Sequence, residues 1–458
     1  MFWVFTVHAN ESVPGQAEQT FARFGSSIYQ VRIINVKSHN LNSSGSGFFV
    51  ADGNIFVTNY HVVSSVVLDP NEFKIVIELG AGEVELDVLA IDVVNDLALL
   101  QVPVTGEALA LREKTPAKGE KMYSVGNPHN IGMTIVEGNY NGLAEDYVFD
   151  RIHFSGAINP GMSGGPTIDG EGRVVGINVQ TGGNQVGFLV PVEKLANLLE
   201  TIPSREAVSL LGSVLAVEQE STAEQVSTSV RPSTVGDSTA VGASASSGNE
   251  EVRAAHYREL QRTIGEQIST ATSSLIEEIN AQPWPYEELA GARVVGKIHD
   301  GFMCWGNSDT DEKKHLSSVV KGCNSRQSIY VSPELNSGYF EYEFRLLQAE
   351  EWPSVAFYQY ATQEFSHGRP SNNAGEEDVG NFTCVNDIVE REEDGLRRKA
   401  AYCTRPYKKY RGLYDSFYMA VTVDRDKKAL MEHFCLSGVT QEKNQHFLEK
   451  FISKAAWQ

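Results

Sequence analysis

Basic residues, cysteines and long hydrophobic runs are all scarce in this sequence of 458 residues, and each shortage disfavours a class of protein. Lys and Arg number 38 against 59 for Asp and Glu, which gives a formal net charge of -21. Such a chain repels phosphate backbones and anionic lipid surfaces, so general nucleic-acid binding is disfavoured. A membrane-spanning helix needs about 20 apolar residues, whereas the best interior run, residues 207–217, is shorter and contains Ser209 and Ser213. The sequence therefore predicts neither a nucleic-acid partner nor a membrane span.

The few cysteines do not have the spacing of a metal cage. All five lie in the last third of the chain, and none forms a C-x-x-C pair: Cys304, Cys323, Cys384, Cys403 and Cys435. The sequence predicts no metal and no organic cofactor. Two pairs are each separated by 19 positions, so we expect local disulfides between Cys304 and Cys323 and between Cys384 and Cys403, with Cys435 left over, as in an exported protein. Five buried free thiols in a cytosolic protein are the alternative.

The first residues, Met1 to Ala9, form a short apolar stretch that ends in a small residue. This is similar to the tail of a secretory signal whose basic front half is missing. We interpret residues 1–19 as a signal remnant or an N-terminal extension, and we expect a periplasmic or extracellular location. An ordinary N-terminal strand or a frayed end is the alternative.

The chain divides by composition into four further parts. Residues 20–202 contain short apolar segments between Gly, Asn, Asp and Pro, such as 27–36 and 73–79, and end in a helical segment at 192–200. This pattern is typical of an all-β barrel or sandwich. Residues 203–249, rich in Ser, Thr and Ala, predict a flexible linker. An amphipathic helix (250–282) follows. Residues 283–458 combine strand-like segments (338–345 and 418–423) with a final helix (446–457), which predicts an α+β domain of unrecognised fold.

The predicted helix over residues 250–282 carries one apolar stripe. Its members recur every three or four positions: Leu260, Ile264, Ile268, Ala271, Leu275 and Ile279. Such a stripe must pack against a partner. We expect the partner to be the domain that follows; a self-associating coiled coil is the alternative, which Gly265 and the Ser/Thr-rich residues 269–274 disfavour.

A serine among glycines carries the chemistry, in the segment Gly161-Met-Ser-Gly-Gly-Pro166. Glycines let the backbone turn tightly and aim successive N–H groups at one point, which is the geometry of an oxyanion hole. The hydroxyl of Ser163 becomes a nucleophile only with a base and an acid that orients the base. His61 ends an apolar strand, where we expect a loop to present its imidazole, and Asp96 precedes an apolar run. The order His61, Asp96, Ser163 is that of a chymotrypsin-like triad.

Six motifs in order extend this interpretation over residues 20–202: Gly45-Ser-Gly-Phe-Phe-Val50, Thr58-Asn-Tyr-His-Val62, Asn95-Asp-Leu-Ala-Leu-Leu100, Gly126-Asn-Pro128, Ile158-Asn-Pro-Gly-Met-Ser-Gly-Gly-Pro166 and Val186-Gly-Phe-Leu-Val-Pro191. With them the region resembles trypsin-like serine protease domains of the HtrA/Deg type. The resemblance implies a chymotrypsin-like double barrel, in which two six-stranded β-barrels pack face to face with the triad in the cleft between them.

The resemblance also implies a serine endopeptidase that acts on protein or peptide substrates through an acyl-enzyme. Ser163 would attack the scissile carbonyl, His61 would shuttle the proton and Asp96 would hold the histidine tautomer. The N–H groups of Gly161 and Ser163 would hold the oxyanion. A homo-oligomer is a further implication, and the candidate contact residues are Phe2, Trp3, Phe5, Phe21 and Phe24.

Met162 departs from the family, which usually carries Asn before the serine. The digestive trypsins carry an Asp there that pairs with a freed N-terminal amine, so activation by a new N-terminus is disfavoured here. Two alternatives follow from Met162. It packs the loop, or it marks a loop that stays disordered until something binds.

The substrate pocket can be assigned only in outline. The resemblance places Ala157, six positions before Ser163, at the base of the primary pocket, where no acid stands to bind Arg or Lys. It also places Gly176, Ile177 and Asn178 on an edge strand that pairs with the substrate backbone. We predict cleavage after small or medium aliphatic residues.

Residues 283–458 lack the Gly-Leu-Gly-like loop of a PDZ module, the usual companion of such proteases. Substrate recruitment or regulation is expected from position alone. Residues 397–411 of this region form a basic stretch. It is either a solvated face that balances the charge of the acidic residues 390–394 or a docking patch for an anionic partner. For the whole chain, two rival functions stay open: a catalytically silent binding protein with a protease fold, or a self-processing effector whose main activity lies in residues 283–458.

Overall fold

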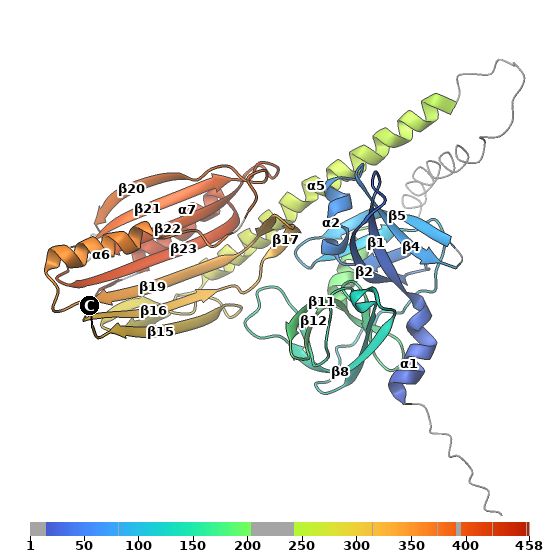
Figure 1. Cartoon of the computed structure of the whole chain (residues 1–458), viewed down its shortest axis with the longest axis horizontal. Helices are drawn as coiled ribbons and strands as arrows, with labels where there is room; N and C mark the ends of the chain where they lie inside the picture. Colours follow the sequence, from blue (N-terminus) through green and yellow to red (C-terminus); the bar gives the residue numbers. More distant parts are fainter. Residues whose placement is uncertain are drawn as a thin grey trace, which may run out of the picture.

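The computed structural model describes residues 15–80, 82–202, 242–313, 315–372, 374–390, 395–423, 425–454 and 456–457. Residues 1–14 of the expected signal remnant and residues 203–241 of the expected linker lie outside these ranges. The described chain forms two β-barrels, a long helix and a separate sheet domain (Figure 1). We call residues 283–458, which carry this sheet, the accessory domain.

The first barrel closes six antiparallel strands in the order β1-β2-β3-β6-β5-β4. Their bounds are β1 (Ile28–Asn35), β2 (Leu41–Val50), β3 (Ile55–Thr58), β4 (Phe73–Leu79), β5 (Gly82–Asp92) and β6 (Leu97–Gln101). Val31 and Ile33 on β1 are fully buried, because every second residue of a strand points to the same face. The associated helices are α1 (Gln16–Phe24), the 3-10 turn η1 (Gly25–Ser27) and α2 (Tyr60–Leu68).

The second barrel closes in the order β10-β11-β12-β9-β8-β7. Its elements are β7 (Lys121–Gly126), η2 (Pro128–Asn130), β8 (Thr134–Leu143), β9 (Ile152–Phe154), β10 (Pro166–Ile168), β11 (Val174–Gly183), β12 (Val186–Pro191) and α3 (Val192–Glu200). One core cluster joins both barrels and includes Leu97 and Leu99 of β6 with Val125 of β7 and Ile177 of β11. The two packed six-stranded barrels match the predicted chymotrypsin-like architecture.

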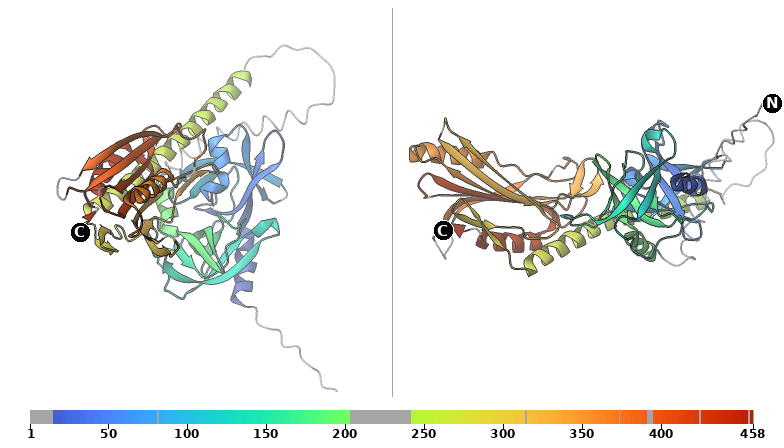
Figure 2. Two further views of the ribbon diagram at one scale, coloured as in Figure 1. Left: turned by 60° about the vertical axis from the view of Figure 1, so that its left-hand side comes forward. Right: turned by 90° about the horizontal axis from the view of Figure 1, so that it is seen from below.

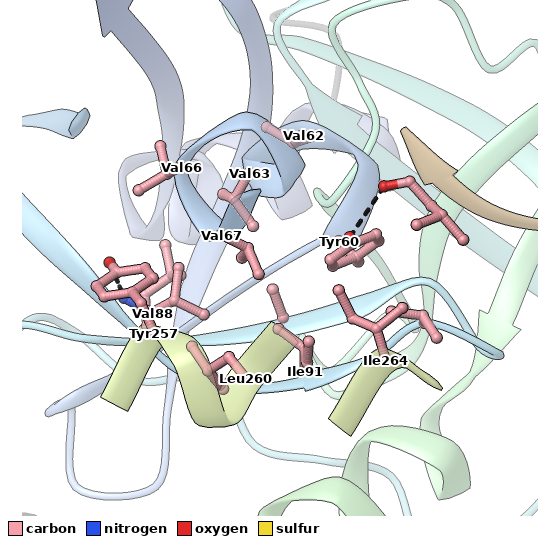
Figure 3. Packing of buried hydrophobic residues seen from close by; sticks show 14 of the residues in the cluster. Tyr60, Val62, Val63, Val66, Val67, Val88, Ile91, Tyr257, Leu260 and Ile264 are labelled. Atoms are coloured by element: carbon pink, nitrogen blue, oxygen red, sulfur yellow. Dashed lines mark hydrogen bonds between the residues drawn. The ribbon is translucent and has the colours of Figure 1, made fainter. Parts of the chain in front are cut away.

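Helix α5 (Gly242–Ala281) begins within the segment that the sequence predicted as linker. Its predicted stripe is buried except for Ala271, which is half-buried, and it packs against two partners. Leu260 and Ile264 lie in one core cluster with Val63 and Val67 of α2, as Figure 3 shows. Further along the helix, Leu275, Ile276 and Ile279 lie in the core of the accessory domain. The expected packing on the following domain is therefore right but incomplete, because the cluster of Leu260 and Ile264 contains Tyr410 of the accessory domain as well as residues of the first barrel, so that α5 packs on both domains (Figure 2).

The accessory domain is built on a seven-stranded antiparallel sheet in the order β15-β16-β19-β23-β22-β21-β20. These strands are β15 (Met303–Asp311), β16 (Leu316–Asn324), β19 (Phe340–Gln348), β20 (Thr383–Glu390), β21 (Arg397–Pro406), β22 (Leu413–Thr422) and β23 (Lys428–Thr440). A small sheet contains β13 (Tyr286–Leu289), β14 (Ala292–Val295) and β24 (Ala456–Trp457), and a hairpin contains β17 (Ile329–Ser332) and β18 (Leu335–Ser337). The helices are α6 (Ser354–Ser366) and α7 (Gln441–Lys454), so the predicted final helix is wrong at residues 456–457.

Two disulfides lie at the two edges of this sheet and confirm the predicted pairing. Cys304–Cys323 joins β15 to β16, and Cys384–Cys403 joins β20 to β21. Cys435 is buried and free. Because each disulfide joins residues that are directly opposite across two neighbouring strands, each edge strand is tied covalently to the strand beside it.

The basic stretch and two of the candidate oligomer contacts make contacts within the chain itself. Ion pairs within the accessory domain occupy members of the basic stretch, including Arg405 with Asp415 at 2.8 Å and Lys409 with Asp378 at 3.1 Å. These pairs disfavour a docking patch for an anionic partner. Phe21 and Phe24 pack against the core that joins the barrels, whereas Phe2, Trp3 and Phe5 lie outside the described residues. No helix within the described ranges is long and apolar enough to cross a membrane.

Candidate active site

The histidine and the acid predicted for the triad lie in contact. The His61 Nδ1 atom is 2.6 Å from the Asp96 Oδ2 atom, and the backbone N–H of His61 donates to the Asp96 Oδ1 atom at 2.8 Å. His61 stands in the first turn of α2 and not in a loop as expected. Since the carboxylate can only accept, Nδ1 carries the proton and Nε2 is left as the basic nitrogen.

Asp96 is held in a strained backbone conformation. Its φ of 62° lies in the left-handed region, which few non-glycine residues adopt, although Asp adopts it more often than most. The Asn59 Nδ2 atom donates to the Asp96 carbonyl oxygen at 2.7 Å, and the backbone N–H of Tyr60 donates to the same oxygen at 3.3 Å. The residues just before His61 therefore fix the acid that orients it. Sequence reasoning missed this role of Asn59, although it lies in a quoted motif.

The surroundings of His61 shift its pKa in two directions. Burial lowers the pKa, and the negative charge and hydrogen bond of Asp96 raise it, so that the net shift is upward from 6.5. The imidazole is consequently protonated to a higher pH than an ordinary histidine. The same shift stabilises the fold at pH below the ordinary pKa, and this contribution is lost as the pH rises through the raised pKa.

For the role of base that the motifs predict for His61, we expect the acid limb of the pH profile of kcat/KM to have an apparent pKa above 6.5, because only the neutral imidazole can accept a proton from serine. Initial rates on a fluorogenic peptide between pH 5 and 9 would measure it. A limb at or below the ordinary histidine value would contradict the prediction.

Ser163 lies on the loop between β9 and β10, which strand β2 holds in place. The backbone N–H of Ser46 donates to the Ser163 carbonyl at 2.8 Å, and the Ser46 hydroxyl donates to the Gly161 carbonyl at 2.7 Å. Glycine at position 45 permits the approach, because a Cβ atom there would lie 2.7 Å from Val62 Cγ2 and 3.0 Å from the Ser163 carbonyl oxygen. Strand β2 thus contacts the loop and also the residue that follows His61. The bracing role of Ser46, in the first quoted motif, was not predicted.

The loop leaves the predicted oxyanion donors free. Gly161 has a φ of 96° and Gly164 a φ of 83°, values that suit glycine. Within the described ranges, the N–H groups of Gly161 and Ser163 have no acceptor. Nor is a hydrogen bond formed, within those ranges, between the Ser163 hydroxyl and His61. In unliganded enzymes this bond is often long and shortens when substrate binds.

Met162 is fully buried and supports the packing alternative over the disordered one. It lies in a core cluster of the second barrel with Met122, Phe154 and Ile158. A Cβ atom on Gly126 would lie 2.8 Å from its Cα. The side chain before the serine is therefore an apolar anchor for the loop.

The predicted edge strand of residues 176–178 is wrong. Gly176 and Ile177 pair with β10 on one side and with β12 on the other, and Ile177 and Asn178 are fully buried. Asn178 instead braces the loop, because its Nδ2 atom donates to the Met162 carbonyl at 3.2 Å. Beyond Asn178 the strand pairs only with β12, so its free edge begins there. Ala157 is half-buried and lies on the segment of chain that leads from β9 to Ser163.

No group of three His, Cys, Asp or Glu side chains in the part of the chain that the structure describes is arranged to hold a metal ion. The chemistry available at the site is that of an imidazole, a carboxylate and a hydroxyl. Together with two free N–H groups, these are the parts needed for nucleophilic acyl transfer.

Comparisons with known proteins agree with the motifs. Residues 45–177 match the family model of the trypsin-like peptidase domain. The chain is 31% identical over 180 residues to a probable periplasmic serine endoprotease DegP-like of Bartonella henselae, across 36% of this chain and 35% of that protein. It is 32% identical over 178 residues to serine protease HTRA4 of Mus musculus, across 36% and 35%. It is 29% identical over 198 residues to the anti-sigma-I factor RsgI9 of Acetivibrio thermocellus, across 42% and 27%.

The chain thus spans about a third of the length of the curated relatives it matches. The family model and the first two relatives confirm the resemblance that the six motifs predicted.

Proposed function

We propose that the protein is a serine endopeptidase, because residues 45–177 match the trypsin-like peptidase domain and the chain is similar to serine proteases of the HtrA/Deg type. The observation that carries the proposal is the 2.6 Å contact between His61 and Asp96 beside a loop whose Gly161 and Ser163 N–H groups lack acceptors within the described residues. A base-orienting pair beside donors that are not used by the fold is typical of a catalytic site.

In the proposed mechanism, Ser163 attacks the scissile carbonyl while the Nε2 atom of His61 takes its proton. Asp96 stabilises the imidazolium that forms. The N–H groups of Gly161 and Ser163 bind the oxyanion of the tetrahedral intermediate. His61 then returns the proton to the leaving amine, and water hydrolyses the acyl-enzyme by the same route in reverse.

We further propose protein or peptide substrates cleaved after small or aliphatic residues, because Ala157 offers no charge to a basic side chain. The two disulfides favour an exported protein, and the periplasmic relative points the same way. A homo-oligomer and a regulatory or recruiting role for the accessory domain complete the proposal.

A fluorophosphonate probe tests the proposed nucleophile. Labelling is expected on Ser163 and should disappear in Ser163→Ala, with hydrolysis reduced about 10⁶-fold and the circular dichroism unchanged. Ser38→Ala, at an exposed serine, is the matched control and should label like the wild type. A folded wild-type protein that does not label would favour the silent binding protein instead.

A further inference from the structure

A side chain of the accessory domain borders the proposed catalytic base. Tyr330 on β17 has its ring centroid 6.1 Å from that of the His61 imidazole, with the two planes at 78°. It also lies 6.4 Å from the ring of Tyr60, the residue before His61. In Figure 1, β17 lies at the end of the accessory domain that faces the barrels. One flank of the imidazole is thus covered from outside the peptidase domain.

The neighbours of Tyr330 fix its direction. Ile329 and Val331 are each 1% exposed and lie in the same core cluster as Val63 of α2 and Ile264 of α5. Tyr330, between them, is half-buried and packs against the margin of the same cluster, beside Tyr60. The Tyr60 hydroxyl donates to the Val331 carbonyl oxygen at 3.0 Å (Figure 3). Burial on both sides of Tyr330 and this hydrogen bond hold it against the first barrel.

The same segment is attached to the second barrel three residues earlier. The side chain of Gln327 accepts from the backbone N–H of Phe149 at 2.7 Å and donates to the Phe149 carbonyl at 2.9 Å. The Arg326 guanidinium lies 5.3 Å from the Tyr147 ring, which is itself 5.2 Å from the ring of Phe188 on β12. Residues 326–331 therefore run from the β8–β9 loop of one barrel to helix α2 of the other.

We propose that residues 326–331 form one wall of the substrate cleft and that Tyr330 is a specificity-determining residue, which limits the size of the substrate side chain lying against His61. The inference rests on the proposed function. Because the imidazole must reach both the Ser163 hydroxyl and the leaving nitrogen, substrate residues next to the scissile bond pass along it. An aromatic ring fixed beside the imidazole leaves room there for small side chains only.

The test uses the full chain and peptides that vary singly at the two positions before and the two positions after the scissile bond. In Tyr330→Ala, the ratio of kcat/KM for a bulky residue to that for a small one should rise at least about tenfold at one position and stay constant at the other three. Tyr330→Phe keeps the ring and should keep the wild-type ratios. Tyr286→Ala, at a half-buried tyrosine on β13 of the same domain, is the matched control.

Labelling by a fluorophosphonate without peptide side chains separates this inference from the function on which it rests. Wild type and Tyr330→Ala should label at similar rates. Labelling of both proteins with unchanged kcat/KM ratios would overturn the inference and leave the proposed peptidase in place. A change of kcat/KM by the same factor for all peptides would also overturn the inference, because Tyr330 would then be a lid or a structural residue. Absence of labelling in the wild type would overturn both.

Discussion

Replacing Asp96 by asparagine is expected to reduce kcat about 10⁴-fold with little change in KM or in stability. The two carboxylate oxygens of Asp96 both accept from His61, one from its backbone N–H and one from Nδ1. Asparagine supplies one oxygen for the backbone N–H, so its NH₂ group must face Nδ1. The imidazole proton then moves to Nε2, and the nitrogen that should take the serine proton is already protonated.

Steady-state kinetics on a peptide substrate would measure the loss, and thermal unfolding would verify that the fold is kept. Asp92→Asn is the matched control. It makes the same chemical change in the same turn, where Asp92 accepts from the Asn95 backbone and side chain and not from the imidazole. Similar losses in the two variants would show that Asp96 only maintains the turn.

The proposed catalytic residues could be predicted from the sequence because each lies in a short local motif, but the contacts that hold them could not. Helix α2 shows why. The sequence predicted an apolar strand that ends at His61 and then a loop. Val62, Val63, Val66 and Val67 are β-branched and disfavour an isolated helix. The helix forms because its apolar face packs on Leu260 and Ile264 of α5 (Figure 3). That partner lies far along the chain and leaves no local signal.

The prediction of an edge strand at residues 176–178 was wrong for a different reason. Apolar alternation around Ile177 predicts a strand but does not say on which sides it is paired. The free edge of β11 begins only after Asn178, where the register with β12 shifts. In the accessory domain, by contrast, equal cysteine spacing was enough to predict both disulfides, because the partners lie on adjacent strands of the sheet.

The second large effect is expected in the accessory domain, where Arg398→Met should lower the free energy of unfolding by about 3–5 kcal/mol. Arg398 and Glu432 have side chains that are each 1% exposed, and the Arg398 Nε atom lies 3.3 Å from the Glu432 Oε1 atom. The guanidinium also donates to the Ile452 carbonyl near the end of α7 at 3.3 Å. Removing Arg398 would take the cation away from a buried carboxylate, whose Oε1 atom also accepts from the Tyr418 hydroxyl at 3.0 Å.

Urea unfolding followed by tryptophan fluorescence would measure the change, because four of the five tryptophans lie in the accessory domain: Trp284, Trp305, Trp352 and Trp457. Arg397→Met, one residue away, is the control. Its side chain is 46% exposed and lies 3.8 Å from Glu390, so its loss should cost about 1 kcal/mol or less. The double variant Arg398→Met with Glu432→Leu should recover most of the stability, because it removes both charges from the core. Equal effects for Arg397 and Arg398, or no recovery in the double variant, would mean that the buried charge is not what makes Arg398 necessary.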